Sequence, residues 1–356
     1  MKRAVGFIAA VVFLFSDAGR GEEPAAPKPG TEAPDKAPAE LSQVQSNLSG
    51  FVAVTNTPVI MKGIFGSRAP SNARGPSTET AVLRCLRWLA KTQNADGSWS
   101  SETDPKTMAT GIVLLPFFAH GETPASTEFG KTVDSALSYL LGSQVEDGTF
   151  RGTEKNPAIE HGIIATAMCE SYSMTKLPRI KVAAEKAMSV IIKTQRSSGL
   201  WASQFETEKG GDDIEASVWA AKAVRAARMA GVMEKELVSV TRKAAEAFPK
   251  MLAGDVEKKK TGPAVASMQR LGLTRDAAYR VGLNALAGMT MNWDQPEFEN
   301  PVFHWHHIST VLFYQGGDAW KNLNRSFSRT LVDRQTVEKE EGKKDCGYWV
   351  SPGKDE

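Results

Sequence analysis

The sequence predicts an all-α protein, an α/α toroid of about six helical hairpins with an outer and an inner layer of helices. Two observations carry this prediction. A turn signature of Gln, Gly and an aromatic residue recurs, and the same interval of 51 residues separates Gln93 from Gln144 and Gln144 from Gln195. Amphipathic helical segments also alternate with segments that are small and apolar on nearly every side.

The amphipathic segments are the predicted outer helices. In the first of them, Val82, Cys85, Leu86 and Leu89 follow the i, i+3, i+4, i+7 spacing of one helical face. Arg, Lys and Glu occupy the other faces, as expected for helices that meet solvent on one side. The six predicted outer segments lie at 82–89, 133–140, 184–191, 235–251, 275–289 and 320–335.

The apolar segments are the predicted inner helices, and Gly, Ala, Ser and Thr cover most of their sides. Repeats that each bury an inner helix stack as an open solenoid or close into a ring, and an inner layer with so few charges favours closure. A sixth inner helix either comes from the stretch before Thr78 or is absent. The five predicted inner helices are Met108–His120, Glu160–Met174, Asp212–Ala230, Gly262–Leu271 and His304–Tyr314.

The repeated turn connects the two layers. Residues 94–97, Asn-Ala-Asp-Gly, are turn formers that end the first outer helix, and Trp99 follows directly. We expect Gln93 to hydrogen-bond backbone at the neighbouring helix end, and Trp99 to pack over the seam between hairpins. Phe150 and Trp201 should do the same in the next two units. The stretch CGYWVSP, 346–352, supplies a last turn and aromatic residue.

The N-terminus carries a targeting signal. Lys2 and Arg3 precede an apolar run, and Ser16 and Ala18 have the spacing of a cleavage site, without a Cys for a lipid anchor. A periplasmic or secreted protein with no membrane span after cleavage follows; an uncleaved anchor is the alternative. The predicted segments are 1–18, the signal peptide; 19–45, a disordered Pro- and Ala-rich spacer; 46–77, an N-terminal extension packing on the toroid; and 78–352, the toroid.

Composition removes some function classes. A net charge of +2 over 356 residues gives no electrostatic basis for binding nucleic acid. The three cysteines form no disulfide framework, and Cys85 and Cys169 fall on apolar helical faces, where they are predicted to be core residues.

Three segments resemble the Gln–Trp repeats of the terpenoid cyclase and protein prenyltransferase superfamily: LRWLAKTQNADGSW, LSYLLGSQVEDGTF and IIKTQRSSGLW. More narrowly, EHGIIATAMCESYSMT, GGDDIEASVWAAKAVRAARMAG and LFYQGGDAWKNLN resemble exported single-toroid proteins of planctomycetes and verrucomicrobia that carry squalene-cyclase or prenyltransferase repeats. The resemblance spans roughly 78–352 and implies a six-hairpin α/α toroid. Because one fold hosts many activities, it does not by itself give a function.

The resemblance to squalene–hopene-type cyclases implies a D-x-D-D motif, in which an Asp protonates an alkene. The matching positions here read Gly210-Gly211-Asp212-Asp213, so the first acid is missing. Asp212 is therefore the candidate general acid, with Asp213 beside it and Glu215 as a substitute partner. The alternative is that Asp212 and Asp213 cap and charge the N-terminus of an inner helix.

Metal and thioester chemistry lack their motifs. Prenyltransferases hold zinc with an Asp-x-Cys pair and a His, but here Asp345 directly precedes Cys346. The Cys–Gln thioester motif of the complement class is also missing. His304 and His307 have the i, i+3 spacing of a helical face and could bind zinc, but a cavity-lining role is the favoured interpretation. No metal site and no cofactor are predicted.

The repeat also places polar residues at one height of the ring. The 51-residue interval relates Thr110, His161 and Asp212, each near the start of an inner helix. Polar groups that converge in an aromatic cavity favour ligand binding; the alternative is that they satisfy facing helix N-termini. The predicted lining of the central cavity comprises Asp212, Asp213, His161, Glu215, His304, Trp305, His306 and His307.

Three functions follow from these observations. The favoured one is an exported toroid that binds a small hydrophobic or isoprenoid ligand, or a peptide, in a central cavity. The second is a terpene cyclase- or transferase-like enzyme with Asp212 as general acid. The third is a structural or interaction protein of the cell envelope.

Overall fold

A computed structural model describes residues 78–100, 105–151, 156–252, 258–298, 300–350 and 352. The predicted signal peptide, spacer and N-terminal extension lie outside these described residues. No helix in the described ranges is long and apolar enough to cross a membrane.

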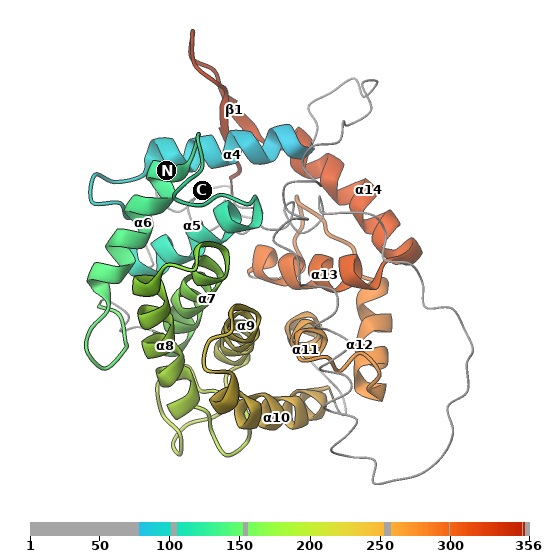
Figure 1. Ribbon diagram of the computed structural model, residues 1–356. Helices are drawn as coiled ribbons and strands as arrows, with labels where there is room; N and C mark the ends of the chain where they lie inside the picture. Colours follow the sequence, from blue (N-terminus) through green and yellow to red (C-terminus); the bar gives the residue numbers. More distant parts are fainter. Residues whose placement is uncertain are drawn as a thin grey trace, which may run out of the picture.

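Two concentric layers of helices form a ring (Figure 1). The described ranges hold six outer and five inner helices, which confirms the predicted all-α toroid. The outer helices are α4 (Thr78–Thr92), α6 (Gly130–Ser143), α8 (Pro178–Lys193), α10 (Glu234–Met251), α12 (Ala277–Ala287) and α14 (Gly317–Asp333). The inner helices are α5 (Lys106–Ala119), α7 (Pro157–Thr175), α9 (Ile214–Ala230), α11 (Lys258–Arg270) and α13 (Pro301–Gln315).

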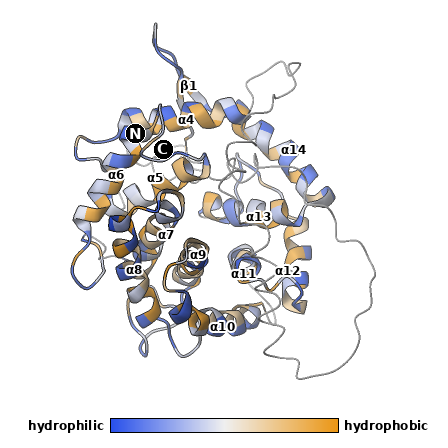
Figure 2. Ribbon diagram, in the orientation of Figure 1, coloured by the Kyte–Doolittle hydropathy of each residue, from blue (hydrophilic) through white to orange (hydrophobic). Residues whose placement is uncertain are grey.

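The two layers differ as their composition predicts. Hydrophilic and hydrophobic residues alternate along the outer helices (Figure 2), which bury one face and expose the other. The inner helix α7 is buried on almost every side, from Pro157 to Ser171. Four of the five inner helices begin earlier than predicted: α5 at Lys106, α7 at Pro157, α11 at Lys258 and α13 at Pro301. In α7 and α13 the first residue is a proline, which is favoured in the first turn of a helix.

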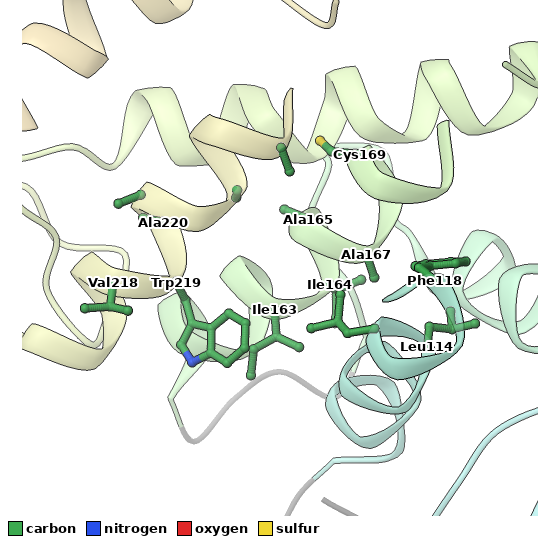
Figure 3. Packing of buried hydrophobic residues seen from close by; sticks show 14 of the residues in the cluster. Leu114, Phe118, Ile163, Ile164, Ala165, Ala167, Cys169, Val218, Trp219 and Ala220 are labelled. Atoms are coloured by element: carbon green, nitrogen blue, oxygen red, sulfur yellow. The ribbon is translucent and has the colours of Figure 1, made fainter. Parts of the chain in front are cut away.

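Small residues let the inner helices approach one another closely. A Cβ added at Gly162 of α7 would lie 2.8 Å from the Cβ of Trp219 in α9, and one at Gly111 of α5 would lie 3.0 Å from Ile164. Figure 3 shows Trp219 beside Ile163, in a continuous apolar core that runs through the inner layer. Cys85 and Cys169 are buried in the same core, as predicted, and burial raises the pKa of both thiols.

The repeated turns lock each hairpin to the next. The indole of Trp99 donates to the carbonyl of Leu89 at 2.9 Å, and that of Trp201 donates to the carbonyl of Ile191 at 2.9 Å. Gln93 donates to the carbonyl of Thr132 in the next outer helix at 2.9 Å. The predicted backbone hydrogen bond of Gln93 to the neighbouring outer helix is therefore confirmed, whereas the indoles of Trp99 and Trp201 bond to the outer helix of their own hairpin.

A short hairpin follows the last outer helix. Strand β1 (Thr336–Glu338) pairs antiparallel with β2 (Cys346–Tyr348), and β2 packs on α4. The Tyr348 ring lies 5.2 Å from that of Trp88 in α4, and the indole of Trp349 donates to the carbonyl of Leu331 in α14 at 2.7 Å. The C-terminal hairpin thus joins the last outer helix to the first.

Candidate functional site

Asp212 is partly exposed to solvent and paired with Arg196. Its side chain is 32% exposed, and its Oδ1 lies 2.9 Å from Nε of Arg196. The same oxygen accepts a hydrogen bond from the Ser198 hydroxyl at 2.8 Å. The ion pair and the hydrogen bond therefore tie the Asp212 side chain to Arg196 and Ser198 at the surface.

Asp213 is the N-cap of α9. Its carboxylate accepts from the backbone N–H of Ala216 at 2.8 Å, which satisfies one of the free N–H groups at the helix start. The structure thus supports the capping interpretation for Asp213 and an ion pair for Asp212. Neither contact brings these two carboxylates to the inside of the ring.

The structure corrects the predicted alignment of Thr110, His161 and Asp212. The backbone N–H of Trp99 donates to Thr110 Oγ1, 11 residues later, at 3.1 Å. The backbone N–H of Trp201 makes the equivalent bond to Ser217 Oγ, 16 residues later, at 3.0 Å. Ser217 is therefore the equivalent of Thr110, because the loop before α9 is five residues longer than the loop before α5.

His161 faces the outer layer. Its Nε2 donates to the carbonyl of Ala187 in α8 at 2.9 Å, and its ring lies against Phe150 and Phe205, at centroid distances of 5.5 and 5.6 Å. Burial lowers the pKa of His161 to about 4, so the ring is neutral near pH 7. The structure does not bring His161 together with the histidines of α13.

Trp305 also faces outward. Its ring lies 5.1 Å from that of Phe327 in the outer helix α14 and 5.9 Å from that of Trp293. His304 is stacked on Phe298 at 4.1 Å, and burial, with the charge of Lys259, lowers its pKa to about 4. These two residues pack α13 against its neighbours.

The opposite side of α13 therefore faces the inside of the ring. Phe303, His307 and Thr310 follow the i, i+4, i+7 spacing of one helical face, roughly opposite Trp305. The His307 ring lies 4.6 Å from that of Phe303, edge to face, and 5.1 Å from that of His306. This face combines an aromatic ring with two imidazoles and a hydroxyl.

Helix α9 presents a matching face. Ser217 bonds to the turn that precedes the helix, and the roughly opposite side carries Glu215, Trp219 and Lys222 at i, i+4, i+7 spacing. On this side Trp219 also lies against Gly162 of the neighbouring inner helix α7. Lys222 Nζ lies 4.9 Å from the centroid of the Trp219 ring. Burial, and secondarily the charge of Asp213, raises the pKa of Glu215.

We call the residues of these two faces, together with Arg270 of α11, whose charge acts on His306 and His307, the inner stripe: Glu215, Trp219, Lys222, Arg270, Phe303, His306, His307 and Thr310. Sequence reasoning had named Glu215, His306 and His307 but missed the other five. A helical-wheel comparison anchored on the repeated turns would have found Trp219 and Lys222, because the residue that bonds the turn defines the outer side of the helix.

Two buried polar side chains of the inner stripe, His307 and Thr310, have no hydrogen-bond partner among the described residues. The atoms concerned are both ring nitrogens of His307 and the hydroxyl of Thr310. His307 is 1% exposed and Thr310 is 6% exposed. An unsatisfied buried polar group costs roughly 1–3 kcal/mol, so these groups are expected to find a partner in the working protein.

The inner stripe does not suit a metal ion. No group of three or more His, Cys, Asp or Glu side chains in the described ranges is arranged to hold one. After burial, the charges of Lys222 and Arg270 act on both His306 and His307 and lower the pKa of each ring. The same positive potential opposes the binding of a cation.

Comparisons with known proteins give structural likenesses only. No family model matches the chain, and no curated protein matches its sequence. Among solved structures, a variant of the type II terpene cyclase MstE from Scytonema in complex with its substrate, geranylgeranyl dihydroxybenzoate, is 14% identical, with a TM-score of 0.41 over 87% of this chain and 96% of that chain. A variant with the product merosterolic acid A is 15% identical, with a TM-score of 0.42 over 87% and 95%. Apo MstE is 14% identical, with a TM-score of 0.40 over 86% of this chain and 96% of that chain.

Proposed function

We propose that the protein is an exported toroid that binds a hydrophobic or isoprenoid ligand at the inner stripe. One observation carries the proposal: His307 and Thr310 are buried on the inner side of α13 without a hydrogen-bond partner among the described residues. They stand beside Phe303, with Trp219 on the facing side of α9. Ligand sites typically combine apolar and aromatic walls with a few polar groups that fix orientation.

Binding is tested with the full-length mature protein and three twelve- or fifteen-carbon probes: dodecanol, dodecanoate and farnesol. Native mass spectrometry and calorimetry should show one probe molecule per chain for at least one of them. Phe303→Ala should weaken binding by several-fold, because it removes an aromatic wall. Phe313→Ala is the matched control, since that ring packs against Trp320 of the outer helix α14.

If none of the three probes binds, the proposal fails and a structural or interaction role in the cell envelope takes its place. The proposed export is tested separately. N-terminal sequencing of the protein secreted by its own host should begin at Gly19, directly after the predicted cleavage site. An N-terminus at Met1 would instead indicate the uncleaved anchor.

One observation favours a second candidate, an acid-catalysed cyclase, with Glu215 in place of Asp212. Burial raises the pKa of Glu215, which favours the protonated form, and Glu215 shares its helical face with Trp219. Incubation with farnesol or squalene and analysis by gas chromatography–mass spectrometry would detect cyclised product. Product formation that is lost in Glu215→Gln and kept in Asp212→Asn would establish this activity, and absence of product from both substrates would reject it.

A further inference from the structure

The seam between the last and the first outer helix is built differently from the other seams of the ring. Along the chain, an inner helix follows each of the outer helices α4, α6, α8, α10 and α12. In the part of the chain that the structure describes, no inner helix follows α14, which leads into the hairpin of β1 and β2 instead. This hairpin packs on α4 (Figure 1), so it spans the seam at which the ring closes.

Helix α4 turns a basic face toward this C-terminal hairpin. Arg84, Arg87 and Lys91 follow the i, i+3, i+7 spacing of one helical face. Arg84 Nη2 lies 3.2 Å from Oδ2 of Asp345, and Lys91 Nζ lies 3.2 Å from Oε2 of Glu338. Two pairs of opposite charge therefore join the hairpin to the first outer helix.

Further ion pairs extend this contact. Lys91 also pairs with Glu340. Glu128, shortly before α6, accepts hydrogen bonds from Arg87 Nε and from Lys344 Nζ, both at 2.7 Å. We call these residues the clasp: Arg84, Arg87 and Lys91 of α4, Glu128, and Glu338, Glu340, Lys344 and Asp345 of the C-terminal hairpin.

Much of the clasp is exposed to solvent. The side chains of Lys91 and Glu340 are 46% and 41% exposed, and that of Lys344 is 65% exposed. Ion pairs between exposed side chains are weak, and salt screens them further. The strength of the clasp should therefore depend on the ionic strength.

Uncharged contacts cross the same seam beside the clasp. Gln335 donates to the carbonyl of Ala81, and the Tyr348 ring lies against that of Trp88. Ala81, Cys85 and Trp88 follow the i, i+4, i+7 spacing of one helical face, and Cys85 is buried. Cys85 thus lies on the face of α4 that the end of α14 and the hairpin cover.

We infer that the clasp is a salt-sensitive closure, whose release lets the ring open at the seam between α14 and α4 while the rest of the toroid stays folded. This seam opens first because exposed ion pairs hold it and because no inner helix of the described ranges follows α14. At the other seams, buried inner helices help to hold the outer helices together. The inference goes beyond ligand binding and does not depend on it.

Thiol labelling of the full-length mature protein tests the inference, because native cysteines lie in different parts of the ring. Cys85 lies at the seam and Cys169 lies in the inner helix α7, and both are free and buried. Iodoacetamide should modify Cys85 several-fold faster at about 1 M NaCl, where the Debye length is about 3 Å, than at about 0.01 M. Cys169 should react equally slowly at both salt concentrations, as measured by mass spectrometry of peptides.

Variants assign the effect to the clasp. Asp345→Lys should speed the labelling of Cys85 several-fold at low salt, because it places a like charge opposite Arg84. Combining it with Arg84→Glu restores an ion pair and should restore the slow rate. Arg179→Glu is the matched control, since it reverses a charge in the exposed pair with Asp134, which joins α8 to α6, and it should leave Cys85 unchanged.

The outcomes are distinct. Equal labelling rates of Cys85 and Cys169 in every condition overturn the inference, because both thiols would then react only through global unfolding. A Cys85 rate that neither salt nor Asp345→Lys changes also overturns it. If Asp345→Lys does not fold, Glu338→Lys, opposite Lys91, carries the same test.

Discussion

The side-chain amide of Gln335 donates a hydrogen bond to the carbonyl of Ala81 at 2.8 Å, across 254 residues of sequence. Gln93 makes the same contact with Thr132 in the first repeat, and Thr132 follows Ala81 by one repeat interval of 51 residues. The bond that joins successive outer helices therefore also joins the last to the first. The toroid is closed by its own repeat contact.

Gln335→Ala should lower the free energy of unfolding by about 1–2 kcal/mol, because it removes one hydrogen bond and leaves the Ala81 carbonyl at the ring closure without it. Urea unfolding measures the change. Gln315→Ala, at the exposed end of α13, is the control and should stay near the wild-type midpoint. Equal midpoints for the two variants would show that the closing contact contributes nothing.

The glycine of the repeated turn is required for two reasons. Gly148 has a φ of +92°, and a Cβ there would lie 2.4 Å from the carbonyl oxygen of Lys186 in the next outer helix. Gly148→Ala should therefore destabilise the protein by roughly 2 kcal/mol or more, from backbone strain and the clash together. The melting temperature, by circular dichroism, measures the loss.

Gly142 provides the matched control for this turn. It lies in α6, six residues earlier, and a Cβ there would meet no atom within 4 Å. Gly142→Ala should be neutral or stabilise the protein by up to about 1 kcal/mol through better helix propensity. If Gly148→Ala were as stable as Gly142→Ala, the close approach of the turn to α8 would be wrong.

The cap of α9 separates a structural carboxylate from a catalytic one. Asp213→Ala should cost about 1 kcal/mol of stability, because Ala216 loses the acceptor for its backbone N–H. Asp213→Asn should recover most of that loss, since an amide oxygen also accepts the bond. Chemical denaturation of both variants tests this; equal losses from Ala and Asn would point to the charge of Asp213 rather than to capping.

The outer helices were predictable because their apolar residues recur with the period of a helix. The turns were predictable because no insertion breaks the 51-residue interval between Gln93 and Gln195. The directions of the inner side chains were not. Helix α7 is buried on almost every side, so periodicity could not show that His161 points outward to Ala187. The longer loop before α9, which makes Ser217 rather than Asp212 the equivalent of Thr110, falls after the aromatic of the turn, where the sequence repeat no longer holds.

The same limit explains the missed basic residues. Lys222 shares α9 with Arg225 and Arg228, and Arg270 shares α11 with three lysines at 258–260, so neither residue stands out in the sequence and neither belongs to a motif. Their importance comes from the packing of α11 against α9 and α13, which gathers residues that lie far apart in sequence. A long-range arrangement of this kind has no local sequence pattern, whereas the histidines of α13 were found because they are adjacent.

His120, at the end of α5, is expected to make the free energy of unfolding fall at alkaline pH. His120 Nδ1 lies 2.8 Å from Glu122 and its Nε2 lies 3.2 Å from Glu79. Burial alone would lower the pKa of His120, but the hydrogen bonds and charges of the two carboxylates outweigh it and raise the pKa from 6.5 to about 9. The folded protein therefore holds this proton more tightly than the unfolded chain does.

Because the pKa is raised in the folded state, the stabilisation is complete below pH 6.5 and is lost as the pH rises through about 9. The expected loss is on the order of 1–3 kcal/mol. Unfolding free energies measured between pH 6 and pH 10 should fall in this window for the wild type, and His120→Gln should make that part of the profile flatter. A variant with an unchanged slope would mean that another group titrates there, and that the two carboxylates do not hold a charged imidazole at the end of α5.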